Sequence, residues 1–278
     1  NTGMAAMAER EGIELVNFEA SGVVRRELDG RVYFLARPAA EADFIISLPK
    51  LKTHVLTLMT GAVKNMFGLI PGFRKANYHK ENPKPADFAQ VVVDILALRP
   101  PDLTIMDAVL AMEGDGPSSG NPRRVNLLLG SADPVALDAV ASDIIGLPPD
   151  KVPTTRIASE AGLGFGWPEA AYIVGQRLAD VRMNDFQLTS NRKLELLPKF
   201  LVRLIDPYVW VRPAIRRDEC TKCNTCVDSC PTHALSGEDE EVPIIDYDTC
   251  INCWCCHELC PSRAVFVNRS WLAKKFIR

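Results

Sequence analysis

Eight cysteines near the end of the chain form one spacing pattern that occurs twice. Each copy reads Cys-x-x-Cys-x-x-Cys-x-x-x-Cys-Pro, first at 220–231 and again at 250–261. Three thiolates separated by two residues can wrap a cuboidal iron–sulfur cluster on one tight loop. The doubled run therefore predicts two 4Fe-4S clusters and a protein that moves single electrons. The cysteines are Cys220, Cys223, Cys226, Cys230, Cys250, Cys253, Cys256 and Cys260.

Zinc and disulfides, the other common uses of cysteine, fit this spacing poorly. Structural zinc sites combine two Cys-x-x-Cys pairs, whereas here three linked cysteines precede a fourth cysteine and a proline. Disulfides need an oxidising compartment, and no signal peptide is visible in the sequence. Because all nine cysteines lie within the cluster runs, we expect a reducing, cytoplasmic location.

The ninth cysteine, Cys255, interrupts the second run as Cys253-Trp254-Cys255-Cys256. Free cysteine is often buried, so we interpret Cys255 as a spare thiol packed beside a cluster. An additional cluster ligand or a redox-active thiol is the alternative interpretation.

A second group of chemically capable residues lies in the segment Leu48-Pro-Lys-Leu-Lys-Thr-His54. In an extended chain, alternate side chains share a face, so Lys50, Lys52 and His54 are predicted to point the same way. Such a face at a strand end suits a carboxylate, phosphate or sulfate. Lys64 and Asn65 follow in a glycine-containing segment predicted to be a helix over 55–69. A solvated basic edge and a glycine-lined packing seam would explain the same residues.

Acidic residues mark four further positions. Asp107 follows a predicted strand over 102–106, and Glu113 lies in a predicted Gly/Pro/Ser-rich loop over 112–122. This loop could hold a metal or cover a ligand, or be a plain acidic surface loop. Asp133 precedes Pro134 as a predicted helix N-cap, and Asp138, one turn later, is expected to be exposed.

Strands and helices alternate over the first two thirds of the chain. A β-branched run at 42–48 predicts a buried parallel strand, 86–98 predicts an amphipathic helix, and basic residues at 72–85 predict a loop. We therefore expect an α/β fold with a mostly parallel sheet and flanking helices over 1–183, where ligands sit at carboxyl strand ends. A linker over 184–213 and a small α+β, ferredoxin-like iron–sulfur domain over 214–278 are expected to follow.

The overall composition excludes several classes of protein. The chain has 278 residues, of which 47% are hydrophobic and 24% are charged, an ordinary composition for a globular protein. Its net charge is −3, so it has no strong positive field that would attract nucleic acid. No apolar run reaches the length of a membrane span, and membrane association is not expected. The chain begins at Asn1 with what reads as the second half of a helix, so we expect it to lack N-terminal elements.

The doubled cysteine run resembles the two-cluster bacterial ferredoxin over residues 216–268. The resemblance implies a hairpin strand within 237–248 and crossed cluster ligation. One cluster would bind Cys220, Cys223, Cys226 and Cys260, and the other would bind Cys250, Cys253, Cys256 and Cys230.

Segments at 48–54, 60–68, 112–117 and 133–138 resemble the family known as domain of unknown function 362, and this resemblance covers nearly the whole chain. Members often carry a C-terminal two-cluster ferredoxin domain. They usually begin with a segment containing Lys-Pro-Asn, which is absent here. The resemblance supports a site at Lys50, Lys52, His54, Lys64 and Asn65 but supplies no substrate.

Two functional hypotheses follow. In the first, the chain is an oxidoreductase whose α/β domain binds an anionic small molecule and exchanges electrons with it through the clusters. His54, Lys52 and Lys64 would be catalytic, with His54 transferring a proton, and the substrate would be bound by Lys50, Asn65, Asp107 and Glu113. In the second, the chain is a non-enzymatic electron carrier or an assembly protein. Both hypotheses need a redox partner protein.

Overall fold

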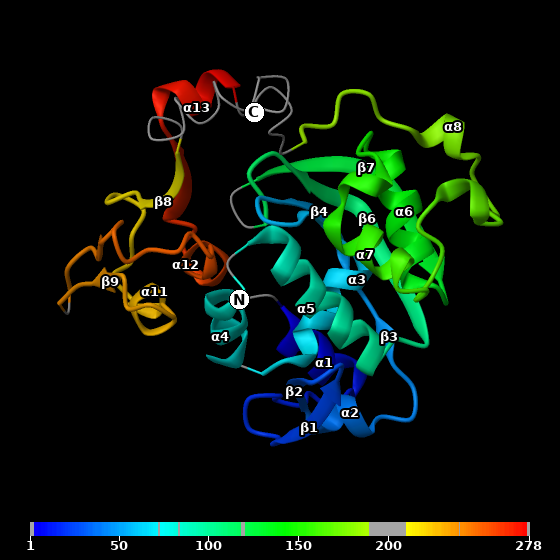
Figure 1. Ribbon diagram of the computed structural model, residues 1–278, viewed down its shortest axis with the longest axis horizontal. Helices are drawn as coiled ribbons and strands as arrows, with labels where there is room; N and C mark the ends of the chain where they lie inside the picture. Colours follow the sequence, from blue (N-terminus) through cyan, green and yellow to red (C-terminus); the bar gives the residue numbers. More distant parts are fainter. Residues whose placement is uncertain are drawn as a thin grey trace.

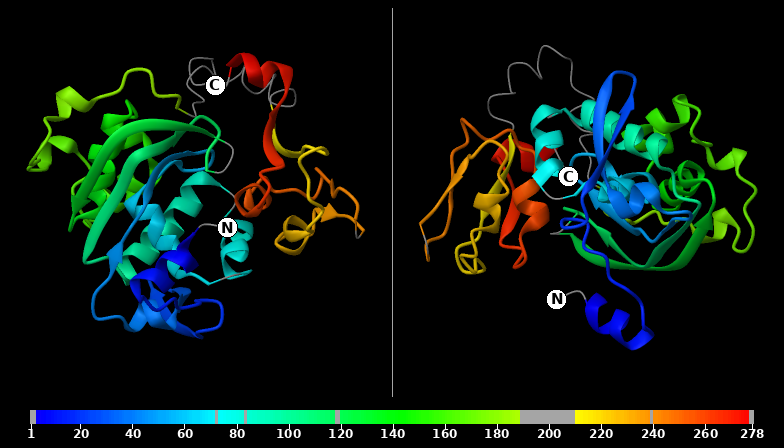
Figure 2. Two further views of the ribbon diagram at one scale, coloured as in Figure 1. Left: turned by 180° about the vertical axis from the view of Figure 1, so that it is seen from behind. Right: turned by 90° about the horizontal axis from the view of Figure 1, so that it is seen from below.

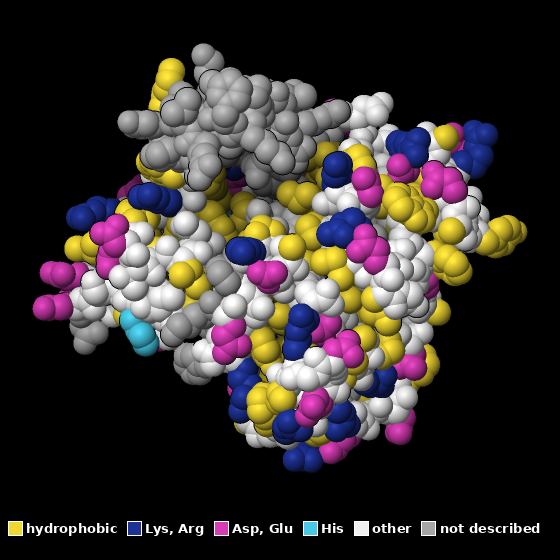
Figure 3. Space-filling view, in the orientation of Figure 1, with side chains coloured by type: hydrophobic (Ala, Val, Ile, Leu, Met, Phe, Trp, Pro, Cys, Tyr) yellow, Lys and Arg dark blue, Asp and Glu magenta, His cyan; other side chains and the backbone are white. Residues whose placement is uncertain are grey.

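The computed structural model describes residues 3–71, 73–82, 84–117, 120–188, 210–238 and 240–276. A larger α/β part contains the described residues up to 188, and a smaller part near the C-terminus lies beside it (Figure 1). On the face shown in Figure 3, Lys and Arg side chains alternate with Asp and Glu over the described α/β part. Within the described residues, the helices are too short or too polar to cross a membrane.

The larger part is built on a five-stranded sheet. Strand β6 (Leu103–Glu113) lies at its centre and pairs antiparallel with β7 (Asn121–Ser131). On its other side β6 pairs in parallel with β3 (Ile46–Ser47) and β4 (Lys50–His54), and β4 pairs antiparallel with β5 (Leu58–Thr60). The sheet is thus mixed, with two parallel and two antiparallel pairings, and the expected predominance of parallel pairs is not found among the described strands. The two antiparallel pairs join strands that are close in sequence, which a short turn can connect.

Helices α5 (Pro85–Leu98), α6 (Pro134–Ile144) and α7 (Pro153–Glu160) pack together on one face of this sheet (Figures 1 and 2). Phe88, Val92 and Ile95 of α5 form one apolar core, and Leu51 and Met106 of the sheet belong to a second. Burial of these side chains supplies the main stabilising free energy of the domain.

Smaller elements surround this core. The remaining helices are α1 (Met4–Glu11), α2 (Arg37–Glu41), α3 (Ala62–Asn65), α4 (Phe73–Glu81) and α8 (Leu178–Val181), with 3₁₀ turns η1 (Met66–Leu69), η2 (Pro149–Lys151) and η3 (Pro168–Ala170). Strands β1 (Val23–Leu28) and β2 (Arg31–Ala36) form an antiparallel hairpin beside the main sheet.

The C-terminal part contains two small antiparallel pairs. Strand β8 (Val211–Ile215) pairs with β11 (Val265–Arg269), and β9 (Leu235–Ser236) pairs with β10 (Ile244–Ile245). Of the second pair, β10 lies within the segment 237–248 that was expected to hold a hairpin strand, and β9 lies just before it. Helices α11 (Thr225–Asp228) and α12 (Cys255–Leu259) contact each other, and α13 (Trp271–Phe276) follows β11. A linker was expected over 184–213, and residues 189–209 of this segment lie outside the described residues.

Several local expectations were wrong. Residues 42–48 contain only the short strand β3, and Phe44, Ile46 and Leu48 are exposed rather than buried. Residues 55–69 form a turn, β5, α3 and η1 rather than one helix, and 73–81 form α4 rather than a loop. Strand β6 extends to Glu113 and β7 begins at Asn121, so the loop between them is shorter than expected. In contrast, α5 and the cap of α6 match the prediction, since Asp133 accepts the Val135 and Ala136 N–H groups.

Asp138 is buried rather than exposed, at 1%. Its carboxylate accepts the backbone N–H groups of Ala62 at 2.6 Å and Val63 at 3.0 Å. These two N–H groups belong to the first turn of α3. Asp138, 75 or more positions away in the sequence, therefore caps the N-terminus of this helix. Burial raises the pKa of Asp138 to about 7, although the two backbone N–H groups oppose this effect.

Gly61 makes this arrangement possible. A Cβ atom added there would lie 2.1 Å from Asp138 Oδ1, whereas one at Gly68 would meet nothing within 4 Å. We predict that Gly61→Ala lowers the free energy of unfolding by about 2–3 kcal/mol, because the methyl group displaces the capping carboxylate. Urea unfolding should detect this, with Gly68→Ala as the matched control. Equal stability of the two variants would contradict the prediction.

Candidate functional site

The sequence-predicted basic residues meet a carboxylate from the other end of the chain. Glu258, on α12 of the C-terminal part, accepts a hydrogen bond from His54 Nε2 at 2.8 Å. The Lys64 ammonium lies 4.0 Å from the same carboxylate oxygen. Lys52 is half-buried and interacts electrostatically with both Glu258 and Lys64. Lys52, His54 and Lys64, predicted as catalytic residues, therefore converge on an anion that belongs to the protein itself.

The hydrogen bonds of His54 fix its tautomer. Its Nδ1 atom accepts the backbone N–H groups of Leu56 at 3.0 Å and Thr57 at 3.2 Å, so the ring proton must be on Nε2. The side chain is fully buried. Burial, with a smaller contribution from Lys64, lowers the pKa of His54 to about 4 against the opposing effect of Glu258. His54 is consequently neutral at pH 7 and donates its only ring proton to Glu258.

Glu258 lies inside the second cysteine run, between Cys256 and Cys260. Burial alone would raise the pKa of its carboxyl group, but Lys64 and the hydrogen bond from His54 hold that pKa well below its usual range. Lys64 itself is buried, with its ammonium 5.9 Å from the Phe67 ring centroid and 5.8 Å from that of Phe88. The faces of aromatic rings stabilise a buried cation such as the Lys64 ammonium group.

The other predicted site residues have different partners. Lys50 is exposed and forms an ion pair with Asp107, which also accepts the Val109 N–H. Asn65 donates to the Ser47 hydroxyl at 2.9 Å, and the buried Glu113 accepts the Gln187 N–H at 3.0 Å. Of these four, only Asn65 borders the cavity described next.

A cavity of about 670 Å³ lies between the two parts of the molecule. Its α/β wall includes residues that sequence reasoning did not select, chiefly Lys75 and His79 of α4, which lay in a segment expected to be a loop. Its other wall comes from α11 and α12. The lining residues are Glu19, Thr60, Lys64, Asn65, Phe67, Gly68, Lys75, His79, Thr225, Asp228, Ser229, Cys255, Glu258 and Leu259.

The cluster cysteines form two sets, each around a small cavity. Cys220, Cys223 and Cys226 share one cavity with Cys260, whereas Cys250, Cys253 and Cys256 share the other with Cys230. The fourth cysteine of each run therefore lies with the first three of the other run, as crossed ligation requires.

Backbone geometry around these sets suits cluster ligation. Lys222, Asn224, Asn252 and Trp254 adopt positive φ angles, which curl each loop tightly around its cysteines. Backbone N–H groups point at sulfur, as from Ala234 to Cys230 at 3.2 Å. Within the described residues, no three Cys, His, Asp or Glu side chains come close enough to hold a single metal ion.

Cys255 connects the second set to the interdomain cavity. It is buried and lines both the cavity of the Cys250 set and the 670 Å³ cavity. Cys255 is thus the lining residue that the two cavities share.

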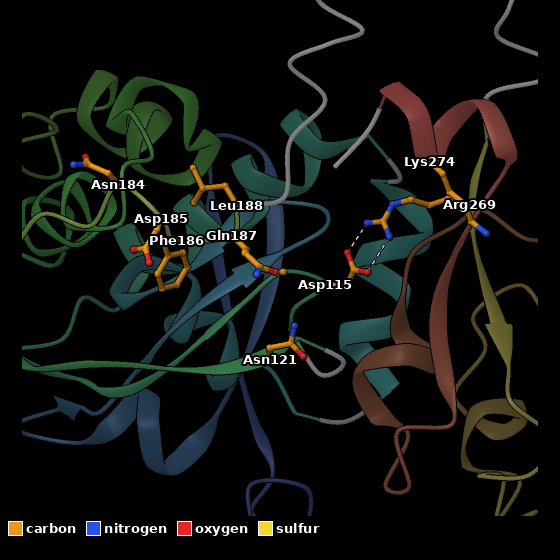
Figure 4. A pocket seen from close by; sticks show the side chains of 10 residues that line it. Asp115, Asn121, Asn184, Asp185, Phe186, Gln187, Leu188, Arg269 and Lys274 are labelled. Atoms are coloured by element: carbon orange, nitrogen blue, oxygen red, sulfur yellow. Dashed lines mark hydrogen bonds and ion pairs between the residues drawn. The ribbon is translucent and has the colours of Figure 1, made fainter.

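A second contact fixes the two parts to each other. Arg269 at the end of β11 forms a two-pronged ion pair with Asp115 in the loop between β6 and β7 (Figure 4). Gly116 of this loop lies against β4, since an added Cβ would be 2.0 Å from the Thr53 carbonyl oxygen. A further cavity of about 760 Å³ borders this ion pair and includes Asn121 and Phe186.

The buried imidazoles predict a pH dependence of stability. Burial lowers the pKa of His79 to about 4, whereas a histidine in the unfolded chain has a pKa near 6.5. The unfolded state therefore binds more protons between these values, so stability is fully present above pH 6.5 and decreases as the pH falls toward 4.

We predict that, from pH 7.5 to 5.0, the free energy of unfolding of the native protein falls by about 2 kcal/mol more than that of His79→Phe, which cannot titrate. Anaerobic urea unfolding at the two pH values measures this difference. His233→Asn, at an exposed position, should behave like the native protein. An equal loss in the His79→Phe protein would contradict the predicted pKa.

Comparisons with known proteins agree with both parts of the structure. Residues 1–143 match the family described as a domain of unknown function, DUF362, and residues 219–264 match the 4Fe-4S dicluster domain. A thylakoid-associated protein of Synechocystis is 38% identical over 164 residues, which are 59% of this chain and 51% of that protein. The chain thus spans about half the length of this relative.

The two matches confirm the resemblances drawn from the motifs. The cysteine sets lie within the second match, and β4, α3 and α6 lie wholly or almost wholly within the first. The chain therefore belongs to the DUF362 family of domains of unknown function, and it carries a C-terminal ferredoxin-type domain that binds 4Fe-4S iron–sulfur clusters for electron transfer.

Proposed function

We propose that this protein is an oxidoreductase that binds two 4Fe-4S clusters and transfers electrons between them and an anionic small molecule in the interdomain cavity. The observation that carries this proposal is the convergence of Lys52, His54 and Lys64 on Glu258. This convergence places the basic residues of the α/β domain on the segment that joins Cys256 to Cys260. A ligand at these residues would lie beside the Cys250 set.

The two cysteine sets suggest an order of electron transfer. Cys223 of the first set is exposed, whereas Cys230 and Cys256 of the second set are buried. The first set is therefore accessible to a redox partner protein, and the second set is close to the cavity through Cys255. When bound, the clusters supply or accept single electrons.

The residues of the α/β domain supply binding and proton positions. Lys64 and Lys52 attract the anion and stabilise negative charge that develops on it. Asn65 borders the same cavity and can donate a hydrogen bond. His54 holds its only ring proton at Nε2 against Glu258, and two backbone N–H groups occupy its Nδ1 atom, so in this proposal His54 positions the Glu258 carboxylate rather than transferring a proton. In this proposal Lys50, Asp107 and Glu113 position the surrounding strands rather than contact the ligand.

The second candidate function is a non-enzymatic electron carrier or assembly protein. It is favoured by the exposure of Cys223 and of Leu259, which is 51% exposed beside the cluster segment. The name of the Synechocystis relative places that protein at the thylakoid; for this chain we retain the cytoplasm as the proposed location, from its cysteine usage.

Cluster content and crossed ligation give one prediction. Anaerobically prepared protein should contain about eight irons and eight sulfides per chain. Cys230→Ser should disturb the signals of the cluster held by Cys250, Cys253 and Cys256, while Cys255→Ser should leave iron content and signals unchanged. Electron paramagnetic resonance of the reduced proteins measures this. Loss of a cluster in Cys255→Ser, or two zinc ions without sulfide, would show that the assignment is wrong.

The anion site gives another prediction. Mass spectrometry of the anaerobically purified full chain should identify a bound organic or inorganic anion, and this anion should reoxidise or reduce the clusters. Lys64→Met should lower the bound fraction at least tenfold, because a charge-assisted contact contributes about 1.5–3 kcal/mol. Lys151→Met, at an exposed lysine of η2, is the control, and iron content should be unchanged in both. Equal anion content in the two variants would favour the carrier function.

A further inference from the structure

The interdomain cavity contains two buried polar atoms that lack hydrogen-bond partners among the described residues. They are Thr60 Oγ1 and His79 Nδ1, and both residues line the cavity. Thr60 is 9% exposed and His79 is 2% exposed. A buried hydroxyl or imidazole nitrogen without a partner costs about 1–3 kcal/mol, so such atoms at a cavity wall indicate where a ligand atom forms a hydrogen bond.

The charges of the cavity wall define the charge of the ligand. Lys64 and Lys75 are the cations that line the cavity, and Glu258 is the anion on its inner wall. Glu19 borders the cavity and interacts electrostatically with Lys75, and Lys52, just outside the lining, interacts with Glu258 and Lys64. Asp228 also borders the cavity but is exposed to water, which screens its charge. Three interacting lysines, Lys52, Lys64 and Lys75, thus face two carboxylates, Glu19 and Glu258, and the one positive charge in excess balances a ligand with one negative charge.

The remaining walls define the body of the ligand. Phe67, Leu259 and Cys255 present apolar surface, and the His79 ring stacks on Phe88 with centroids 4.0 Å apart, which fixes its orientation. A volume of about 670 Å³ lies within the range of sites that enclose organic molecules of ten or more heavy atoms. Inorganic phosphate or sulfate would leave most of this apolar surface uncovered.

From these observations we infer that the cavity binds an organic monocarboxylate with an apolar body, whose carboxylate accepts hydrogen bonds from the Thr60 hydroxyl and from the Lys75 and Lys64 ammonium groups. His79 contacts the ligand near the same end. This inference rests on the proposed function and specifies its ligand class. Of its recognition residues, Lys64 lies on α3, whereas Thr60 on β5 and Lys75 on α4 were not selected as site residues from the sequence.

Calorimetric titration of the full, cluster-loaded chain under anaerobic conditions tests this inference. The probes are 2-naphthoate, its uncharged analogue 2-naphthamide, and inorganic phosphate. We expect 2-naphthoate to bind with a stoichiometry of one and at least tenfold more tightly than either of the others. The amide lacks the charge, and phosphate lacks the apolar body.

Two threonine substitutions, each of which removes a buried hydroxyl group, provide the matched comparison. Thr60→Val removes the hydroxyl with little change of shape, and Thr104→Val removes another buried hydroxyl that lacks a partner but lies outside the cavity lining. Thr60→Val should weaken 2-naphthoate binding about tenfold, the loss expected for one hydrogen bond to a charged group, while Thr104→Val should not. Iron content and unfolding midpoint serve as checks that both variants fold.

The possible outcomes separate this inference from the proposed function. Tight phosphate binding without 2-naphthoate binding, or equal 2-naphthoate binding by Thr60→Val and Thr104→Val, would overturn the ligand class while leaving an anion site. Failure of all three probes would also overturn it. If in addition no anion accompanies the purified chain, the proposed function fails as well.

Discussion

The hydrogen bond between His54 and Glu258 is the interaction on which the organisation of this molecule depends. It joins residues 204 positions apart and links the central sheet directly to the segment between two cluster cysteines. Breaking it would leave the buried imidazole N–H of His54 without an acceptor, which costs about 1–3 kcal/mol. This penalty holds the ferredoxin-type domain in one position against the α/β domain.

Neutrality of His54 makes this contact compatible with the lysines around it. A protonated His54 would add a third positive charge beside Lys52 and Lys64 in a region from which water is largely excluded. Backbone donors at Nδ1 remove this possibility, because they require a lone pair there. One carboxylate therefore faces two cations and one neutral donor. The Arg269–Asp115 ion pair adds a second, separate attachment, so rotation about the first contact is restricted.

The parts of this structure that were predicted from sequence depend on neighbouring residues. The cysteine runs, the Asp133 cap of α6 and the extent of α5 are each encoded within about a dozen residues, so spacing and periodicity reveal them. The prediction of one helix over 55–69 was wrong because of a residue from a distant helix. Asp138 accepts hydrogen bonds from the N–H groups that begin α3, so the helix starts there and not earlier. The segments 48–54 and 60–68 indicated Lys52, His54 and Lys64 as candidate site residues, but no local pattern indicates that Glu258 lies against them.

The role of Glu258 was not predicted because it lies inside a cysteine run, and cluster binding already explained that run. In that run it is one of three residues between Cys256 and Cys260, and the spacing constrains none of their identities. His79 and Lys75 were missed for a different reason, since a basic segment without apolar periodicity predicts a loop, whereas α4 packs through aromatic contacts with Phe67 and Phe88. In both cases a cluster motif or a surface segment also forms the wall of a cavity that exists only where two domains meet. Such a site forms only when the two domains dock. The hydrogen bond between His54 and Glu258 fixes this docking, and it therefore also fixes the shape of the cavity.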